Sequence, residues 1–429
     1  MIPERPFTEL LSEIVDNRGR SCPTEEQGFL PLIATNCVTN SSLYPKYDTS
    51  RYVSQQTYDT WFRGHPEPGD LLFVCKGSPG RVCMVPKPVD FCIAQDMVAV
   101  RPDPARVYPR YLLAALRSPL VQARIAAMHV GTLIPHFKKG DFNKLLIPLP
   151  AKPAQVAIGD FYLHLSAKVE QNERTATALV ALADSLFQAW FVDFEPVKAK
   201  SAGDRRFTSM PGGLYDEFPD RLVDSTVGSI PQGWEVKPLS SIATFLNGLA
   251  LQKYPPTGGG TDVPVIKIAQ LRRGSADGSS WASADVPAQY MIDDGDVLFS
   301  WSGTLAVENW FGGPGALNQH LFKVTSSKWP QWFYLHWLRH YLPWFQGVAK
   351  SKATTMGHIN RNHLDEALVP LPPPSVLQGA DPVLGGLHQL RASVILESRK
   401  LSAFRDYLLP RLLSGDRELD AHVAEDLAQ

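Results

Sequence analysis

The stretch GTLIPHFKKGDFNKLLIPLP at residues 131–150 returns 222 residues later as ATTMGHINRNHLDEALVPLP at residues 353–372. Aligned without a gap, His136 matches His358, and both stretches end in Pro-Leu-Pro. This spacing is far longer than the 20–50 residues of a solenoid repeat. Each copy therefore contains a whole domain and the segment that follows it.

Motifs upstream of this stretch occur in the same order in both copies. GDLLF at 69–73 matches GDVLF at 295–299, and Gln95 and Gln319 follow at similar places. One matching pentapeptide would be expected by chance, whereas several in the same order indicate duplication.

Short apolar runs between Gly/Pro turns predict strands within each copy. One apolar helix is expected near 109–127 in the first copy and near 330–346 in the second. The expected fold class is α+β: two tandem domains with small irregular sheets and helices, each followed by a long helix.

Heptad spacing predicts the two long helices after the Pro-Leu-Pro turns. The expected seam consists of Leu165, Val169, Asn172, Leu179 and Leu186 in the first helix and Leu387, Val394, Leu401 and Leu408 in the second. Arg391 and Arg405 interrupt the second seam, where Leu390 and Phe404 offer a neighbouring apolar edge. Asn172 either fixes the register of the pair or faces solvent.

These patterns divide the chain into six segments. They are a first globular domain at 1–150, a long helix at 151–195, a linker at 196–229, a second globular domain at 230–372, a second long helix at 373–415 and an acidic tail at 416–429.

Composition excludes several classes of protein. The 429 residues are 44% hydrophobic with a net charge of −1, which argues against disorder and against a generally basic nucleic-acid binder. We expect neither a signal peptide nor a membrane span. The five cysteines form no CxxC pair, so we expect reduced thiols and no metal site. P-loop, HExxH and GxSxG motifs are absent from the sequence.

The architecture resembles the specificity subunit of a type I restriction–modification enzyme. IPQGWEVKPLSSIA at 230–243 is similar to that family's entry into its second target-recognition domain. SLFQAWFVDFEPV at 185–197 is similar to the end of its central conserved helix. HINRNHLDEALVPLPPP at 358–374 and LSAFRDYLLPRLLSGDREL at 401–419 are similar to its closing segments.

The resemblance implies a non-catalytic, cytoplasmic DNA-binding chain of a phage-defence restriction system. Each target-recognition domain would recognise one half of a split target in double-stranded DNA. The two helices would form an antiparallel coiled coil that sets the unread spacer. Two copies of a modification subunit would methylate adenine with S-adenosylmethionine, and a motor–nuclease subunit would cut DNA using ATP and Mg²⁺. The chain itself would hold no cofactor or metal.

Base recognition requires polar and basic side chains on loops that enter a groove. The candidates for base contact are Arg18, Arg20, Lys76, Ser78 and Arg81 in the first copy and Lys253, Lys267, Arg272, Arg273, Ser300, Ser302 and Thr304 in the second. The candidates for phosphate contact are Lys138, Lys139, Lys350, Lys352 and Arg361.

Three alternatives stay open from the sequence. The chain could serve a methylation-only system or another phage-defence complex. It could be a thiol hydrolase that uses Cys75 or Cys83 with a histidine. It could also be a coiled-coil scaffold with two protein-binding adaptor domains, which the tryptophans between Trp301 and Trp344 would suit.

Overall fold

The computed structural model describes residues 2–17, 19, 21–47, 51–93, 95–128, 134–351 and 357–415. They belong to two compact units. The first unit contains residues 1–173 and 397–429, and the second contains residues 174–396. Each unit therefore includes one globular domain and a part of both long helices.

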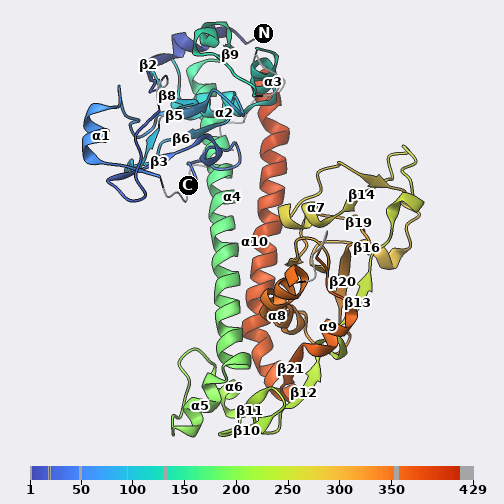
Figure 1. Ribbon diagram of the computed structural model, residues 1–429. Helices are drawn as coiled ribbons and strands as arrows, with labels where there is room; N and C mark the ends of the chain where they lie inside the picture. Colours follow the sequence, from blue (N-terminus) through green and yellow to red (C-terminus); the bar gives the residue numbers. More distant parts are fainter. Residues whose placement is uncertain are drawn as a thin grey trace. The chain divides into compact units, whose positions relative to one another are not determined.

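The first unit is built on a four-stranded antiparallel sheet (Figure 1). Its order is β2 (Leu11–Val15), β8 (Met97–Pro102), β5 (Leu71–Val74) and β6 (Val82–Met84). A three-stranded sheet has the order β4 (Tyr52–Val53), β3 (Leu30–Ile33) and β7 (Cys92–Ile93), with β3 and β7 parallel. β1 (Glu4–Pro6) pairs with β9 (Leu146–Pro148), and the helices are α1 (Gln55–Thr60), α2 (Pro109–Arg117) and α3 (Pro119–Met128).

The second unit repeats this strand order. Its antiparallel sheet is β13 (Thr244–Asn247), β20 (Leu321–Thr325), β17 (Val297–Ser300) and β18 (Val307–Asn309). Its other sheet is β15 (Trp281–Ala282), β14 (Val263–Ile266), β19 (Gly315–Leu317) and β16 (Met291–Ile292), with β14 and β19 parallel. β12 (Glu235–Pro238) pairs with β21 (Leu368–Leu371), and the helices are α7 (Ile268–Arg273), α8 (Gln331–Ser351) and α9 (Arg361–Glu366). The duplication predicted from the sequence is thus present in the topology.

A Gly-Asp pair begins the central strand of each antiparallel sheet. Gly69 and Gly295 have φ values of +92° and +95°, a conformation that glycine adopts without steric cost. The following aspartates form ion pairs inside their own sheets, Asp70 with Arg101 at 2.9 Å and Asp296 with Lys323 at 2.7 Å. The matching GDLLF and GDVLF motifs therefore specify the start of the same buried strand.

The long helices α4 (Lys152–Phe187) and α10 (Pro374–Ser414) pack antiparallel in each unit. In the first unit, Arg405 donates to Ser166 at 3.0 Å and Asn172 donates to Glu397 at 2.6 Å, so residue numbers rise on one helix as they fall on the other. In the second unit, Phe187 shares a hydrophobic core with Leu384.

The residues of the predicted seam are buried or half-buried in the structure. Leu165, Val169 and Asn172 are buried, and the other seam residues, Leu179, Leu186, Leu387, Val394, Leu401 and Leu408, are half-buried. Asn172 is only 2% exposed and hydrogen-bonded, so it does not face solvent. Leu390 and Phe404 do not close the second seam, because each is 50% exposed.

The segment at 196–229 is not the open linker expected from its glycines and prolines. It contains α5 (Glu195–Ser201), α6 (Gly212–Glu217), β10 (Leu222–Ser225) and the first residues of β11 (Gly228–Pro231), which forms a hairpin with β10. Val197, Leu214, Tyr215 and Phe218 join the core of the second unit. The Lys200 ammonium donates to three carbonyl oxygens at the end of α6, at 2.6–3.1 Å. This segment is therefore a folded part of the second unit and contributes to its hydrophobic core.

One described helix, Lys152–Val192, is long and apolar enough to cross a membrane by length and composition alone, with a mean hydropathy of 1.4 in its most apolar window. No stretch of this kind was predicted from the sequence. The helix seam places Leu, Ala and Val residues close together, and these raise the mean hydropathy of the window. Core helices of water-soluble proteins meet the same criterion, so this is weak evidence for a span. The Asp184 carboxylate on this helix lies 2.8 Å from Nδ1 of the buried His336 inside the second unit.

Candidate nucleic-acid interface

Each globular domain has a loop after its central strand that pairs with the histidine segment noted in the sequence. In the first domain, Gly77 N–H donates to the Pro135 carbonyl at 2.9 Å and Phe137 N–H donates to the Cys75 carbonyl at 2.8 Å. Lys76 and His136 therefore face each other as a single antiparallel β-bridge between these two hydrogen bonds. The loop and the histidine segment are therefore held side by side by the backbone.

The second domain has the same arrangement. Gly303 N–H donates to the Gly357 carbonyl and Ile359 N–H donates to the Trp301 carbonyl, both at 2.9 Å. Isolated bridge pairing joins Ser302 to His358. Gly77 and Gly303, the residues that follow the bridged positions, have φ values of +85° and +64°. Two loops of the same geometry thus present different side chains.

In the first domain this loop borders a cleft of ≈ 500 Å³, here called the Lys76 cleft. It is lined by Asp16, Gly19, Lys76, Asp96, His136, Lys138, Lys139 and Gly140. Lys76 and Asp96 lie 3.8 Å apart, Lys139 and Asp16 lie 3.3 Å apart, and Lys138 is exposed. Three of the candidate lysines are therefore brought together, beside two carboxylates that were not predicted.

The equivalent place in the second domain holds Ser302, Trp301 and His320 in place of the lysine–aspartate pair. The Ser302 hydroxyl lies 2.9 Å from Nδ1 of His320. The Trp301 indole donates to Asn247 at 2.9 Å, and its ring centroid lies 5.9 Å from His320 and 6.5 Å from His358. The sequence did not single out Asp96 or His320, although each directly follows one of the matched residues Gln95 and Gln319.

Two predicted base contacts in this region are corrected by their burial. Ser300 is fully buried, and its hydroxyl donates to the Thr304 carbonyl at 2.8 Å and accepts from Ala306 N–H at 2.7 Å. Ser302 is 3% exposed. The Ser300 hydroxyl therefore holds the turn that carries the exposed Thr304, whereas the Ser302 hydroxyl contacts His320, and neither hydroxyl faces solvent.

The remaining candidates are spread over loops and helix ends. Lys267 donates to Ser280 at 2.7 Å, Arg273 pairs with Asp277 at 2.8 Å, and Arg361 donates to the Phe245 carbonyl at 3.2 Å. Lys253, Arg272 and Lys350 are exposed, and Ser78 and Arg81 are half-buried. Arg18, Arg20 and Lys352 lie outside the described residues.

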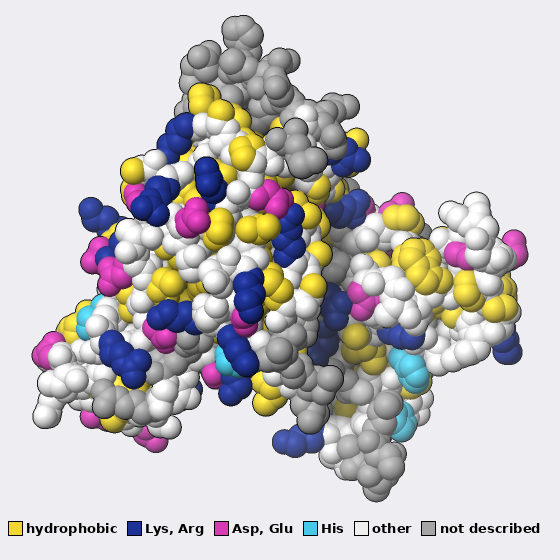
Figure 2. Space-filling view, turned by 90° about the horizontal axis from the view of Figure 1, so that it is seen from above, with side chains coloured by type: hydrophobic (Ala, Val, Ile, Leu, Met, Phe, Trp, Pro, Cys, Tyr) yellow, Lys and Arg dark blue, Asp and Glu magenta, His cyan; other side chains and the backbone are white. Residues whose placement is uncertain are grey.

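Charge is dispersed on the visible surface. On the face shown in Figure 2, lysine and arginine side chains are interspersed with acidic and hydrophobic ones and form no single continuous basic patch. This distribution accords with the net charge of −1. Any contact with nucleic acid by this face would depend on local groups more than on a general electrostatic field.

Cys75 and Cys83, the cysteines considered for a thiol hydrolase, lack the environment of a catalytic thiol. Burial raises the pKa of the Cys83 thiol and of the Cys92 thiol to about 12, and Cys75 is fully buried. A nucleophilic cysteine needs a lowered pKa and access to solvent. Within the described ranges, no group of three His, Cys, Asp or Glu side chains is placed to hold a metal ion.

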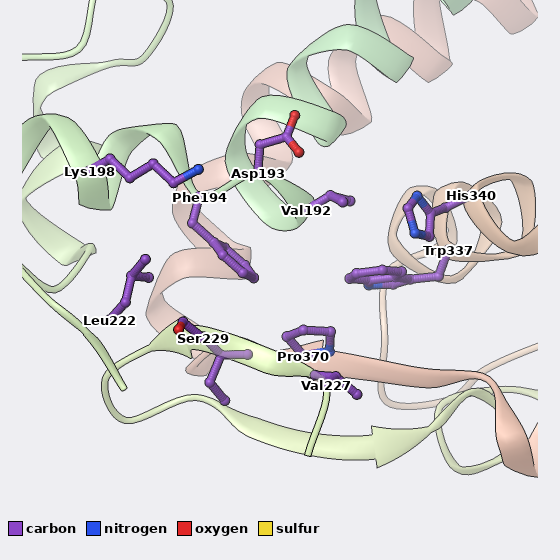
Figure 3. A pocket seen from close by; sticks show the side chains of 11 residues that line it. Val192, Asp193, Phe194, Lys198, Leu222, Val227, Ser229, Trp337, His340 and Pro370 are labelled. Carbon is purple, nitrogen blue, oxygen red and sulfur yellow. The ribbon is translucent and has the colours of Figure 1, made fainter. Parts of the chain in front are cut away.

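A separate cavity of ≈ 350 Å³ lies in the second unit at the end of the first long helix. Phe194 and Trp337 point toward one another across it, with Val192 beside them and Pro370 below (Figure 3). The Trp337 indole N–H has no hydrogen-bond partner in the described part of the chain. Its lining combines apolar side chains with Asp193, Lys198, Ser229 and His340.

Comparison with known proteins points to one family. Residues 11–179 and 231–383 match the family model described as "Type I restriction modification DNA specificity domain". The chain is 23% identical, over 397 residues, to the type I restriction enzyme HindI specificity subunit of Haemophilus influenzae, covering 81% of this chain and 86% of the relative. It is 22% identical, over 323 residues, to the MjaIX specificity subunit of Methanocaldococcus jannaschii, covering 73% and 70%.

A solved structure supports the fold. The S subunit of a type I restriction–modification system from M. genitalium superposes with a TM-score of 0.53 at 15% identity, covering 97% of this chain and 96% of that one. At this identity the likeness shows the fold alone.

Proposed function

Because the chain belongs to the type I restriction–modification DNA specificity family, we propose that it recognises a bipartite target and directs partner subunits to it. The observation that supports this most directly is the pair of equivalent loops. The same backbone hydrogen bonds hold Lys76 beside His136 and Ser302 beside His358. Equal frameworks with different side chains are suited to two domains that recognise different half-sites.

The chemistry is proposed to lie in the partners. Two modification subunits would methylate adenine with S-adenosylmethionine, and a motor–nuclease subunit would translocate and cut DNA with ATP and Mg²⁺. The proposed cellular location of the chain is the cytoplasm, where these partners would meet DNA. This chain would contribute base recognition and spacing, and the partners would add contacts to phosphates that its near-zero net charge does not favour.

The helix pair is proposed to fix the length of the unread spacer. α4 has 36 residues and α10 has 41. The hydrogen bonds Ser166–Arg405 and Asn172–Glu397 lock the register of the pair in the first unit, because shifting one helix by a turn would separate both. A fixed register is what a spacing element requires.

Exchange of residues 1–150 for the first domain of another family member tests the proposal. Assembled with modification subunits, the chimera should methylate a target with a new first half-site, an unchanged second half-site and an unchanged spacer. An exchange of the junction strand alone, residues 146–150, serves as the control and should alter nothing. Changes in both half-sites would contradict independent recognition, and an assembled wild-type complex without any DNA preference would favour a protein-binding scaffold.

A further inference from the structure

The positions of Asp96 and His320 are equivalent in the two domains. The parallel strand pairs align Ile33 with Ile93 in the first domain and Ile266 with Leu317 in the second. Asp96 lies three residues after Ile93, and His320 lies three residues after Leu317. The carbonyl of each accepts the backbone N–H that precedes the loop bridge, Cys75 N–H at 2.8 Å and Trp301 N–H at 3.3 Å.

The side chains at these positions form one polar pair in each domain. In the first domain the pair is Lys76 with Asp96 at 3.8 Å. In the second domain the pair is Ser302 with His320 at 2.9 Å. The duplication has therefore kept the backbone of this place and replaced both side chains, from a charged pair to a hydroxyl–imidazole pair.

The Lys76–Asp96 pair is not required for packing. The two side chains are 45% and 44% exposed, and their separation is near the upper limit for an ion pair. A pair with this exposure stabilises a fold little. Asp70 differs, because it is 2% exposed and holds Arg101 inside the sheet. Lys76 and Asp96 can therefore separate at little cost to stability, and each can then bind a polar group of a ligand.

The carboxylate decides which part of DNA this pair suits. Asp96 and Asp16 lie in the same cleft as the lysines, and a carboxylate repels a phosphate. A carboxylate accepts from the N4 amino group of cytosine, while a lysine donates to O6 or N7 of guanine in the major groove. A lysine and an aspartate side by side therefore match the edge of a G·C pair.

From these observations, we infer that Lys76 and Asp96 recognise a G·C base pair in the first half-site, and that His320, which the buried Ser302 hydroxyl contacts, occupies the position in the second domain that corresponds to Asp96. The inference rests on the proposed bipartite recognition. It adds the residues that determine specificity and the base pair that one pair of them selects.

The test is the double variant Lys76→Ser with Asp96→His, which places the second domain's pair in the first. Wild-type and variant chains are assembled with modification subunits, and binding is measured on a pool of duplexes with each half-site randomised in turn. We expect the preference for G·C at one position of the first half-site to fall about 10- to 100-fold, with the second half-site unchanged.

The matched control is Arg106→Ser with Asp103→His. This pair, at 3.2 Å, follows β8 at the opposite end of the sheet from the Lys76 loop. It should leave both half-sites unchanged. Retained preference at the second half-site shows that each variant is folded and assembled.

Asp96→Asn decides the question if the double variant does not assemble. An amide both donates and accepts hydrogen bonds, whereas a carboxylate only accepts. The preference for G·C over the other base pairs should therefore weaken at the same single position of the first half-site. An unchanged first half-site in either variant, with the wild type still selecting a bipartite target, would overturn the inference alone. A wild type without a bipartite target would instead overturn the proposed function.

Discussion

Arg405 is predicted to be the most important polar residue of the helix pair in the first unit. It is 9% exposed, donates to Ser166 at 3.0 Å and to Asp406 at 2.9 Å, and its guanidinium lies 5.3 Å from the centre of the Tyr162 ring. A hydrogen bond from a charged group contributes about 1.5–3 kcal/mol. A cation–π contact in a partly desolvated place adds about 1 kcal/mol.

Arg405→Ala should therefore lower the free energy of unfolding of the first unit by about 3 kcal/mol. For a unit of this size, such a loss lowers Tm by roughly 6–12 °C. Arg405→Met keeps most of the buried stem and removes the charge together with its hydrogen bonds. Because replacing a buried charge by an apolar side chain of similar volume is often nearly neutral, Arg405→Met should cost less than about 1.5 kcal/mol.

Differential scanning calorimetry, with circular dichroism at 222 nm as a second probe, measures both variants. The control is Arg411→Ala on the same helix, where the guanidinium stacks 3.7 Å from the centre of the Tyr407 ring but Tyr407 is 52% exposed. This control should cost less than about 1 kcal/mol. Equal losses for Arg405→Ala and Arg411→Ala would refute the assignment of a buried stabilising role to Arg405.

Three further predictions concern acid stability, spacing and dependence on partners. Burial lowers the pKa of His388 to about 3 and also lowers the pKa of His336, so the unfolded state binds more protons than the folded state below about pH 6.5. The second unit should lose stability as pH falls from about 6.5 towards 4, by up to about 1.4 kcal/mol per pH unit from His388, and His388→Asn should flatten this slope in urea titrations; an equal slope would contradict it. Four residues inserted near Thr175 add about 6 Å, close to two base pairs of rise, and should lengthen the spacer. Two inserted residues instead rotate the seam by about 200° and should abolish methylation by the assembled complex. Full activity of the four-residue variant with an unaltered spacer would contradict the spacing role. The purified chain with S-adenosylmethionine and no partner should incorporate no labelled methyl groups into DNA, and incorporation would refute a non-catalytic role.

The duplication and the helix seam were predictable because they depend on local rules. A glycine with positive φ before a buried strand and a heptad spacing of apolar residues each leave a pattern in the sequence. The sequence therefore predicts the two α+β domains and places Leu165 and Val169, which are buried, on the helix seam.

Other features depend on partners distant in the chain and left no such pattern. The glycines and prolines of 196–229 indicated an open linker, but Val197, Tyr215 and Phe218 find a core supplied by the second domain. In the sequence, Ser300 and Ser302 resemble exposed loop residues. Their burial could not be predicted, because their hydrogen-bond partners, the Thr304 carbonyl and His320, are positioned only by the fold. Asp96 was missed because its lysine partner lies 20 residues earlier.

The central claim is that this chain specifies a bipartite DNA target. Mapping methylated adenines across a host genome, with and without the gene for this chain, tests it most directly. We expect one motif to disappear with the gene: two specific half-sites separated by a spacer of constant length. A methylation pattern that is unchanged by loss of the gene, or a lost motif that is continuous and undivided, would contradict the account.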